Sequence, residues 1–164
     1  MDYLNAIANR FRATAPVADY WSLRLVSEET EHLAVRQGVT EPSALGSSLG
    51  AMVTLVQAGG IGYGATSDLS PAGLAAAWTR AARWAERHAR LGLFPADLYP
   101  RSSLRADYAS PVAEPWEGLS LVDKLDLLHD ACAALEIDPR IVDSSAWLGR
   151  RLVRQLLVTS DGGE

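Results

Sequence analysis

The chain has 164 residues, of which 48% are hydrophobic and 21% charged, a composition typical of a globular domain and not of a disordered segment. Its formal net charge of −5 argues against an extensive nucleic-acid surface, because contacts to phosphates require a basic surface. The one cysteine, Cys132, excludes an internal disulfide and a cysteine-based zinc cluster, and it fits a reducing cytoplasm. No run reaches the roughly 18–20 apolar residues of a membrane span. We therefore expect one cytoplasmic domain over residues 1–164 that contacts neither membrane nor nucleic acid.

The first part of the chain predicts a helix followed by strands. Residues 2–13 form an amphipathic helical pattern, whereas residues 20–29 and 32–38 alternate between apolar and polar side chains, as half-buried strands do. We interpret the acidic stretch between these strands, residues 27–31, as an exposed turn that serves solubility. The residues expected to be buried are Leu4, Ile7, Ala8 and Phe11 in the helix and Trp21, Leu23 and Leu25 in the first strand.

Residues 41–50 predict a loop and residues 51–57 a third strand, after which a glycine-rich segment begins. This segment contains the pattern G-x-G-x-x-A at Gly60, Gly62 and Ala65. In a dinucleotide-binding enzyme such a pattern opens a helix whose amide groups bind the pyrophosphate. A nucleotide-binding enzyme is therefore one hypothesis for this chain.

The start of the next helix argues against that hypothesis. Ser70 is a suitable N-cap and Pro71 a suitable first helical residue, and both come after Ala65. Ile61, Tyr63 and Ala65 also alternate with glycines, as in a strand. We therefore favour a hairpin turn followed by a fourth strand, with glycines where neighbouring backbone comes close.

Two longer helices are expected in the remaining chain. The first spans residues 71–91 and ends at Gly92, and the second begins after Ser120, with Asp123 completing a capping box. The apolar positions are Leu74, Trp78, Ala81, Ala82, Ala85 and Ala89 in the first helix and Leu121, Leu125, Leu128, Cys132 and Leu135 in the second.

Residues 95–115 predict an extended arm or long surface loop, and residues 140–160 predict two strands around a turn near Gly149. The fold class that follows is α+β: an N-terminal helix and a mixed or antiparallel sheet of about four to six strands, packed against two longer helices. The last residues contain Asp161-Gly162, a hairpin signal that lacks a second strand. We therefore expect the natural chain to continue past Glu164.

The residues do not form a local catalytic constellation. His32, His88 and His129 lack metal-ligand spacing, and we expect them to be structural. Cys132 falls on an apolar helical stripe and is expected to be a core residue. A row of arginines on the first long helix is interpreted as a solvated face, although it could bind an acidic partner; it consists of Arg80, Arg83, Arg87 and Arg90.

The order of the motifs resembles the N-terminal domain of the TldD/PmbA metallopeptidases, a family also described as modulators of DNA gyrase. The resemblance covers nearly the whole chain, and the stretch from Tyr108 onward is more similar to the TldD branch. It is carried by "RQGVTE", "GAMVTL" and "GIGYGATSDLS" and by the alanine-rich helix that follows. The positions matching the family motif, all expected to be structural, are Gly38, Gly50, Gly60, Gly62, Asp68 and Ser70.

The resemblance implies that the chemistry lies outside these residues. Family members hold a metal, expected to be zinc, on a His-Glu-x-x-x-His helix, and this pattern does not occur in the sequence. No catalytic or metal residue and no cofactor is therefore assigned to this chain. The resemblance further implies a dimer with a family member and a substrate of unfolded or extended peptide, which a strand edge can bind through its main chain.

Two functions remain open at this point. The chain is either the non-catalytic N-terminal domain of a TldD-like metallopeptidase, contributing cleft wall and subunit contacts, or a stand-alone module that binds a peptide or partner without a metal domain.

Overall fold

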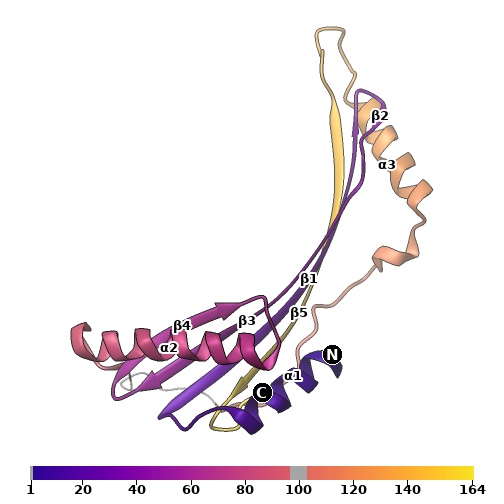
Figure 1. The fold of residues 1–164 in the computed structure, drawn as a ribbon. Coiled ribbons are helices and arrows are strands. Elements are labelled where there is room, and N and C mark those ends of the chain that lie inside the picture. The colour runs from indigo at the N-terminus through magenta and orange to yellow at the C-terminus, as the bar shows by residue number, and fades with distance from the viewer. Residues whose placement is uncertain (1, 97–102) are drawn as a thin grey trace. The chain divides into compact units, whose positions relative to one another are not determined.

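The computed structural model describes residues 2–96 and 103–164 and has an α+β fold (Figure 1). The strands form a five-stranded antiparallel sheet in the order β2-β1-β3-β4, and β5 pairs with β1 as well. The expected fold class is confirmed. The elements are α1 (Asp2–Thr14), β1 (Tyr20–Arg36), β2 (Val39–Thr40), β3 (Ala44–Gln57), β4 (Gly60–Thr66), α2 (Pro71–Leu91), the 3-10 helix η2 (Trp116–Gly118), α3 (Leu121–Ala134) and β5 (Ser145–Thr159).

The chain divides into two compact units, and three long strands contribute residues to both. The first unit contains residues 1–27, 48–107 and 154–164, and the second contains residues 28–47 and 108–153.

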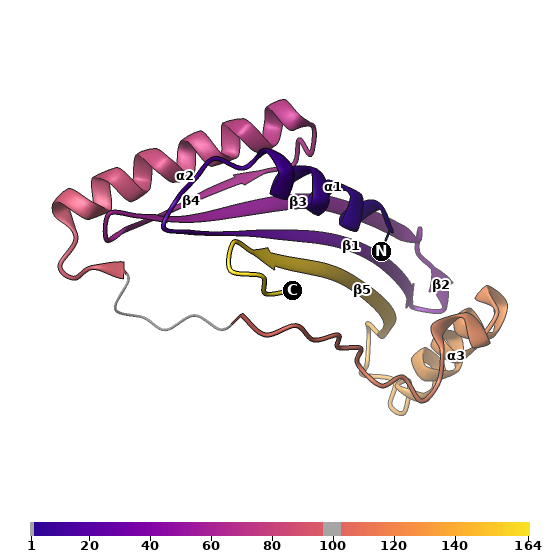
Figure 2. The same cartoon turned by 90° about the horizontal axis from the view of Figure 1, so that it is seen from below.

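In the first unit, α1 and α2 cover one face of the sheet (Figure 2). The helix predicted at the N-terminus buries its four expected apolar residues there, and Phe11 packs edge-on against Trp21 with ring centroids 5.2 Å apart. Burial of this apolar surface is the main stabilising contribution to the unit. The other residues of this core come from the strands, from α2 and, for Leu69, from the link between β4 and α2; they are Trp21, Leu23, Leu25, Ala51, Val53, Leu55, Leu69, Leu74, Ala77, Ala81, Ala85, Leu156 and Val158.

The helix α2 lies directly on β4, where three glycines face it. A Cβ atom added at Gly60, Gly62 or Gly64 would lie 1.9–2.0 Å from a carbonyl oxygen of α2. The helix in turn presents alanines, of which Ala81 and Ala85 are fully buried. Small residues on both sides therefore let two backbones approach to a distance that any larger side chain on β4 would prevent.

A two-residue turn joins β3 to β4. Gln57 pairs with Gly60, and the turn residues Ala58 and Gly59 have φ values of 50° and 73°. Positive φ at both positions is the geometry of tight hairpins whose twist matches the strands. The carboxylate of Asp19 accepts a hydrogen bond from the Ala58 N–H at 2.6 Å, so the strained residue is held from outside the turn.

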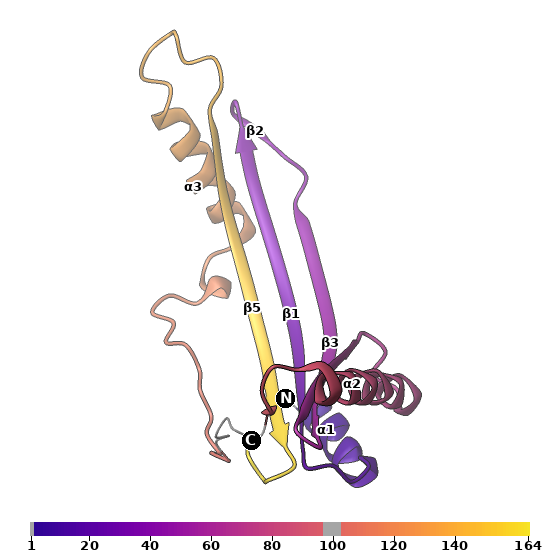
Figure 3. The ribbon, with the colours of Figure 1, turned by 90° about the vertical axis from the view of Figure 1, so that its left-hand side faces the viewer.

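In the second unit, α3 packs on β1 and β5 (Figure 3). Leu128 and Cys132 of the helix contact Leu33 and Val35 of β1. The N-terminus of α3 has the predicted capping box between Ser120 and Asp123. The buried Cys132 confirms the expectation of a core residue.

The acidic stretch at residues 27–31 is not a turn, because β1 is one continuous strand from Tyr20 to Arg36. The acidic side chains have partners in the second unit: Glu28 accepts from Arg151 of β5 at 2.6 Å, and Glu31 accepts from the indole N–H of Trp116 at 2.8 Å. Opposite charges on adjacent strands stabilise the pairing that a row of acids alone would oppose.

Two other predicted breaks are also strand. Residues 44–50, expected in a loop, belong to β3, and the expected turn near Gly149 lies inside the continuous strand β5. Both segments are rich in small or charged residues with weak strand preference, so their conformation is set by pairing with β1. The described part of the arm, residues 103–115, has no regular structure, and residues 97–102 lie outside the described residues.

The predicted apolar stripes of the two long helices are each correct only in part. In α3, Leu121 and Leu135 are exposed, whereas Lys124 is buried with its ammonium 4.1 Å from the centroid of the Trp116 ring. The sheet contacts only the middle of this helix, so its terminal leucines are left outside. In α2, the buried face includes Ala77, while Ala89 is exposed.

Substitution of Gly62 by Ala should test the contact between α2 and β4. The added Cβ would meet the Ala81 carbonyl oxygen at 2.0 Å, so we expect the free energy of unfolding to fall by about 3 kcal/mol. The matched control is Gly50→Ala, whose Cβ would lie 3.5 Å from the Thr66 oxygen and should change stability by less than about 0.5 kcal/mol. Urea denaturation measures both, and equal losses would contradict the close contact.

The capping box of α3 should make its stability depend on pH. Ser120 donates hydrogen bonds to Asp123 from its N–H at 3.0 Å and its hydroxyl at 2.6 Å, and these bonds hold the pKa of the carboxyl below its ordinary value. A lowered folded-state pKa means that the carboxylate stabilises the fold above its unfolded-state pKa, and that this stabilisation is lost as the pH falls through the folded-state pKa.

We therefore expect Asp123→Asn to be less stable than the parent at neutral pH and the difference to shrink as the pH falls from about 4 through the lowered folded-state pKa. Denaturation followed by circular dichroism across this range measures the change. Ser120→Ala removes the hydroxyl bond to Asp123 and the N-cap bond of about 1 kcal/mol but keeps the backbone N–H, so its stability deficit should persist at low pH. A difference that stays constant down to about pH 2 would refute this role of Asp123.

Candidate functional site

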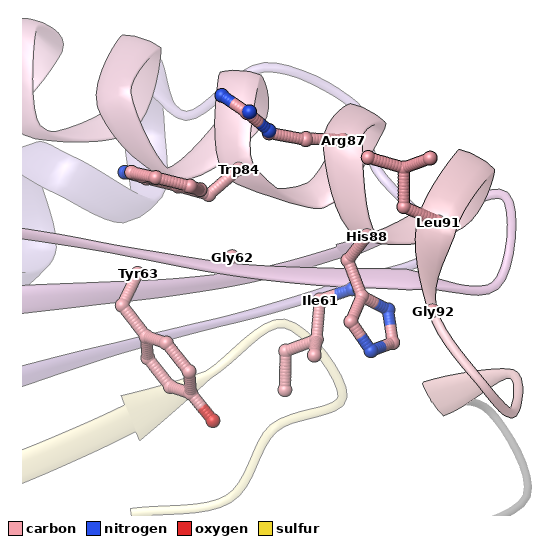
Figure 4. A pocket seen from close by; sticks show the side chains of 8 residues that line it. All are labelled: Ile61, Gly62, Tyr63, Trp84, Arg87, His88, Leu91 and Gly92. Carbon is pink, nitrogen blue, oxygen red and sulfur yellow. The ribbon is translucent and has the colours of Figure 1, made fainter.

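A hollow of about 500 Å³ lies along the outer edge of β4, beside the second half of α2 (Figure 4). The strand β4 ends the sheet on this side. The hollow is mainly apolar, and both elements that form it belong to the first unit. Its walls consist of Ile61, Gly62 and Tyr63 from β4 and Trp84, Arg87, His88, Leu91 and Gly92 from α2 and its C-terminal end.

Exposed aromatic side chains flank the strand edge on both sides. Trp84 on α2 is 57% exposed, and Tyr63, on the sheet face away from α2, is 53% exposed. The guanidinium of Arg87 lies 5.7 Å from the centroid of the Trp84 ring. Large aromatic groups held open to solvent in this way are typical of contact surfaces for other molecules.

Two polar side chains of α2 reach the backbone of the same edge. His88 Nδ1 accepts a hydrogen bond from the Ile61 N–H at 3.4 Å, and Arg80 donates to the Ala65 carbonyl oxygen at 2.5 Å. These side chains satisfy backbone groups that would otherwise have only water as a partner. The edge is therefore partly capped by the helix that covers the sheet.

The arginine row on α2 forms the exposed face that the sequence predicts. Four arginines are exposed, and Glu86 is the only acidic residue between the first and the last of them. The face is not wholly solvated, however, because Arg80 binds β4 and Arg87 stacks on Trp84. A cationic surface thus borders the hollow, although the whole chain has a formal net charge of −5.

The six motif positions do not form one site. Gly38, with φ of 71°, lies in the turn between β1 and β2, and Gly50 lies in β3. Gly60 and Gly62 face α2. Of the six positions, only Gly62 lines the hollow. The interpretation of the glycine segment as turn and strand is confirmed, because no helix begins at Gly62.

Asp68 and Ser70 organise the entry to α2. The Ser70 hydroxyl accepts from the Gly73 N–H at 3.2 Å, and Asp68 accepts from the Ser70 N–H at 2.9 Å. The bonds from Ser70 hold the pKa of the Asp68 carboxyl below its ordinary value. That these positions serve structure alone stays a prediction.

The three histidines lie on separate elements. His32 stacks on Trp147 with ring centroids 5.7 Å apart, and His129 Nε2 lies 3.0 Å from the Thr40 hydroxyl. Of the three, only His88 lies in the hollow. Within residues 2–96 and 103–164, no three histidine, cysteine, aspartate or glutamate side chains gather in a way that could hold a metal ion.

The hollow itself was not predicted from the sequence. Trp84 falls between two arginines on the helical face expected to be solvated, so nothing in the pattern of α2 marks it. The available signal was the combination of an exposed tryptophan with a glycine-rich strand at a sheet edge.

Residues 21–89, which run from β1 through α2, match the family profile described as PmbA/TldA metallopeptidase domain 1. This segment is thus similar to the first domain of the PmbA/TldA metallopeptidases. The matched residues include β4, most of α2 and six of the eight residues that line the hollow; Leu91 and Gly92 lie beyond the match.

Solved structures with a similar fold come from three organisms. A candidate modulator of DNA gyrase from Thermotoga maritima is 12% identical with a TM-score of 0.66, and the match covers 97% of this chain and 36% of that protein. TldE from Thermococcus kodakarensis is 12% identical with a TM-score of 0.65, covering 99% and 35%. A candidate modulator of DNA gyrase from Bacteroides thetaiotaomicron is 16% identical with a TM-score of 0.61, covering 97% and 39%.

The chain thus spans between 35% and 39% of the length of these proteins. A comparison with curated proteins finds no match. Among the residues that the structure describes, no helix is both long and apolar enough to cross a membrane.

Substitution of His88 by Ala should expose the Ile61 amide. Loss of the acceptor at 3.4 Å removes a weak hydrogen bond, so exchange of the Ile61 amide should accelerate roughly fivefold. Hydrogen exchange followed by NMR measures this rate. Arg83→Ala, on the exposed face of the same helix, is the control and should leave the rate unchanged; equal rates in the parent and His88→Ala would contradict the cap.

Proposed function

We propose that this chain is the non-catalytic N-terminal domain of a TldD-like metallopeptidase that degrades or processes unfolded peptides. In this role it contributes a wall of the substrate cleft and contacts to a second subunit of the same family. The observation that carries the proposal is the match of residues 21–89 to the first domain of these metallopeptidases. The assignment to the TldD branch rests on the sequence resemblance.

The partly open edge of β4 supports a peptide as the substrate. An extended chain can add to a sheet edge through main-chain hydrogen bonds, which depend little on sequence. A protein in unfolded conformation presents such segments, whereas a folded protein has already paired them. The aromatic side chains beside the edge add apolar contact area for the side chains of the bound segment.

The metal belongs, in this proposal, to a part of the protein outside these residues. The described residues do not fit a zinc site, because each histidine lies on a different element without the further ligands that zinc requires. The length of the matched structures supports the same arrangement, since this chain corresponds to little more than a third of them. Zinc bound there would activate the water that attacks the peptide bond.

The protein of residues 1–164 should therefore show no proteolysis of casein or of an unfolded peptide. A longer product of the same gene, with a His-Glu-x-x-x-His helix beyond Glu164, should cleave both and lose this activity in a chelator. A fluorescent casein assay on the two proteins, with a mock preparation as control, measures the difference. Chelator-sensitive cleavage by residues 1–164 alone would overturn the proposal, and a stop codon after Glu164 would instead favour a stand-alone binding module.

A further inference from the structure

The register of the hairpin defines which backbone groups of β4 point away from the sheet. Because a two-residue turn is closed by the hydrogen-bonded pair Gln57 and Gly60, the even-numbered residues of β4 bond to β3. The N–H and C=O groups of Ile61, Tyr63 and Ala65 therefore face outward. The bonds from the Ile61 N–H and to the Ala65 carbonyl, which both go to α2, agree with this assignment.

The bonds from His88 and Arg80, called here the two caps, occupy two of the outward backbone groups of β4 and leave four others unpaired; we call these four groups the window. Once His88 holds the Ile61 N–H and Arg80 the Ala65 C=O, the remaining groups are the Ile61 C=O, the Tyr63 N–H and C=O and the Ala65 N–H. In the part of the chain that the structure describes, no protein group pairs with these four. Three of them belong to Ile61 and Tyr63, which line the hollow, and the Ala65 N–H follows along the same edge.

This window matches a short strand that runs parallel to β4. In parallel pairing, one residue of the added strand lies beside Gly62, donates to the Ile61 C=O and accepts from the Tyr63 N–H. The residue two positions later lies beside Gly64, donates to the Tyr63 C=O and accepts from the Ala65 N–H. The first and third of three residues thus use all four groups, and the middle residue directs its own N–H and C=O away from β4.

A strand added antiparallel to β4 would compete with the two caps for their backbone groups. It would direct a carbonyl toward the Ile61 N–H, where the Nδ1 of His88 already accepts, and an N–H toward the Ala65 carbonyl, where Arg80 already donates. Each encounter places like groups against one another, so one bond must break before another forms. The caps therefore favour the parallel direction.

The side chains around the window define what the added strand should contain. Residues beside Gly62 and Gly64 direct their side chains toward α2, because neighbouring residues of a sheet share a face. Beside Gly62 the hollow offers Trp84 and Leu91, which suit an apolar side chain. Beside Gly64 the helix presents Arg80, which binds the Ala65 carbonyl oxygen, and Arg83 lines a second small hollow together with Arg80; this positive charge suits a carboxylate.

We propose that the edge of β4 binds an acidic extended peptide, parallel to the strand, with an apolar residue beside Gly62 and an acidic residue two positions later. The proposal rests on the peptide-binding role inferred above and specifies its site, direction and preferred sequence. Tyr63 contacts the intervening residue from the opposite face.

Fluorescence anisotropy of a labelled peptide with the central sequence Leu-Ser-Glu between further glutamates tests the proposal. Binding should weaken about tenfold in Trp84→Ala and in Arg83→Glu, which remove the apolar contact and reverse one charge. Trp147→Ala and Arg10→Glu, exposed changes away from the hollow, are the matched controls and should bind like the parent. Equal affinity of all five proteins would overturn the site.

Modified peptides test the backbone pairing and its direction. Methylation of the leucine or glutamate backbone nitrogen should reduce affinity at least about tenfold, whereas methylation of the serine nitrogen should not. The swapped peptide Glu-Ser-Leu and the counterpart with lysines should both bind more weakly.

A nitroxide at the N-terminus of the peptide should broaden NMR signals near Gly60 and not near Thr66. Reversed broadening would overturn the direction, and tighter binding of a single-stranded oligonucleotide would overturn the peptide as occupant.

The same variants separate this proposal from the metallopeptidase role. If the longer protein cleaves casein in a chelator-sensitive way and Trp84→Ala affects neither cleavage nor peptide binding, the site is refuted while the metallopeptidase role stands. If the peptide binds as described but the longer protein has no metal-dependent activity, the site stands and the metallopeptidase role is refuted.

Discussion

The direct contact of the α2 backbone with the glycines of β4 sets the geometry on which the edge of the sheet depends. Two residues of a strand advance about 6.6 Å and four residues of a helix about 6.0 Å, so the two repeats nearly coincide. Gly60, Gly62 and Gly64 accordingly meet successive turns of α2. On the next stripe of the helix, Arg80, Trp84 and His88 are spaced four residues apart. Arg80 reaches the Ala65 carbonyl and His88 reaches the Ile61 N–H, and Trp84 lies between them.

Local sequence signals were sufficient to predict the parts of the fold whose stabilising hydrogen bonds join residues close together in the sequence. The bounds of α2 follow from Ser70 as N-cap, Pro71 in the first turn and Gly92 after the last, and the capping box of α3 follows from Ser120 and Asp123. The glycine segment could be assigned to a strand because the helix signal comes too late for a phosphate-binding loop. In each case the stabilising partner lies within a few residues of the chain.

The errors concern segments whose partners are distant in sequence. Glu28 pairs with Arg151, which lies more than a hundred residues later in the chain. The acidic residues therefore resemble an exposed turn when the sequence is analysed without β5. The hollow escaped prediction for a similar reason. Trp84 and Tyr63 belong to different elements, and only the tertiary contact of α2 with β4 brings them to the same edge. A sequence pattern describes one element at a time and contains no such pairing.

The cationic border of the β4 edge also limits what can pair there. An edge strand with unpaired backbone groups can pair with the same strand of a second copy of the chain, which is a common route to aggregation. A second copy would bring its own Arg80, Arg83 and Arg87 against those of the first, and the like charges would oppose the approach. It would also have to pair through capped groups if the two copies were related by a twofold axis, because that symmetry makes the joined edges antiparallel. The features that disfavour self-association are thus the ones that favour an acidic segment running parallel to the strand.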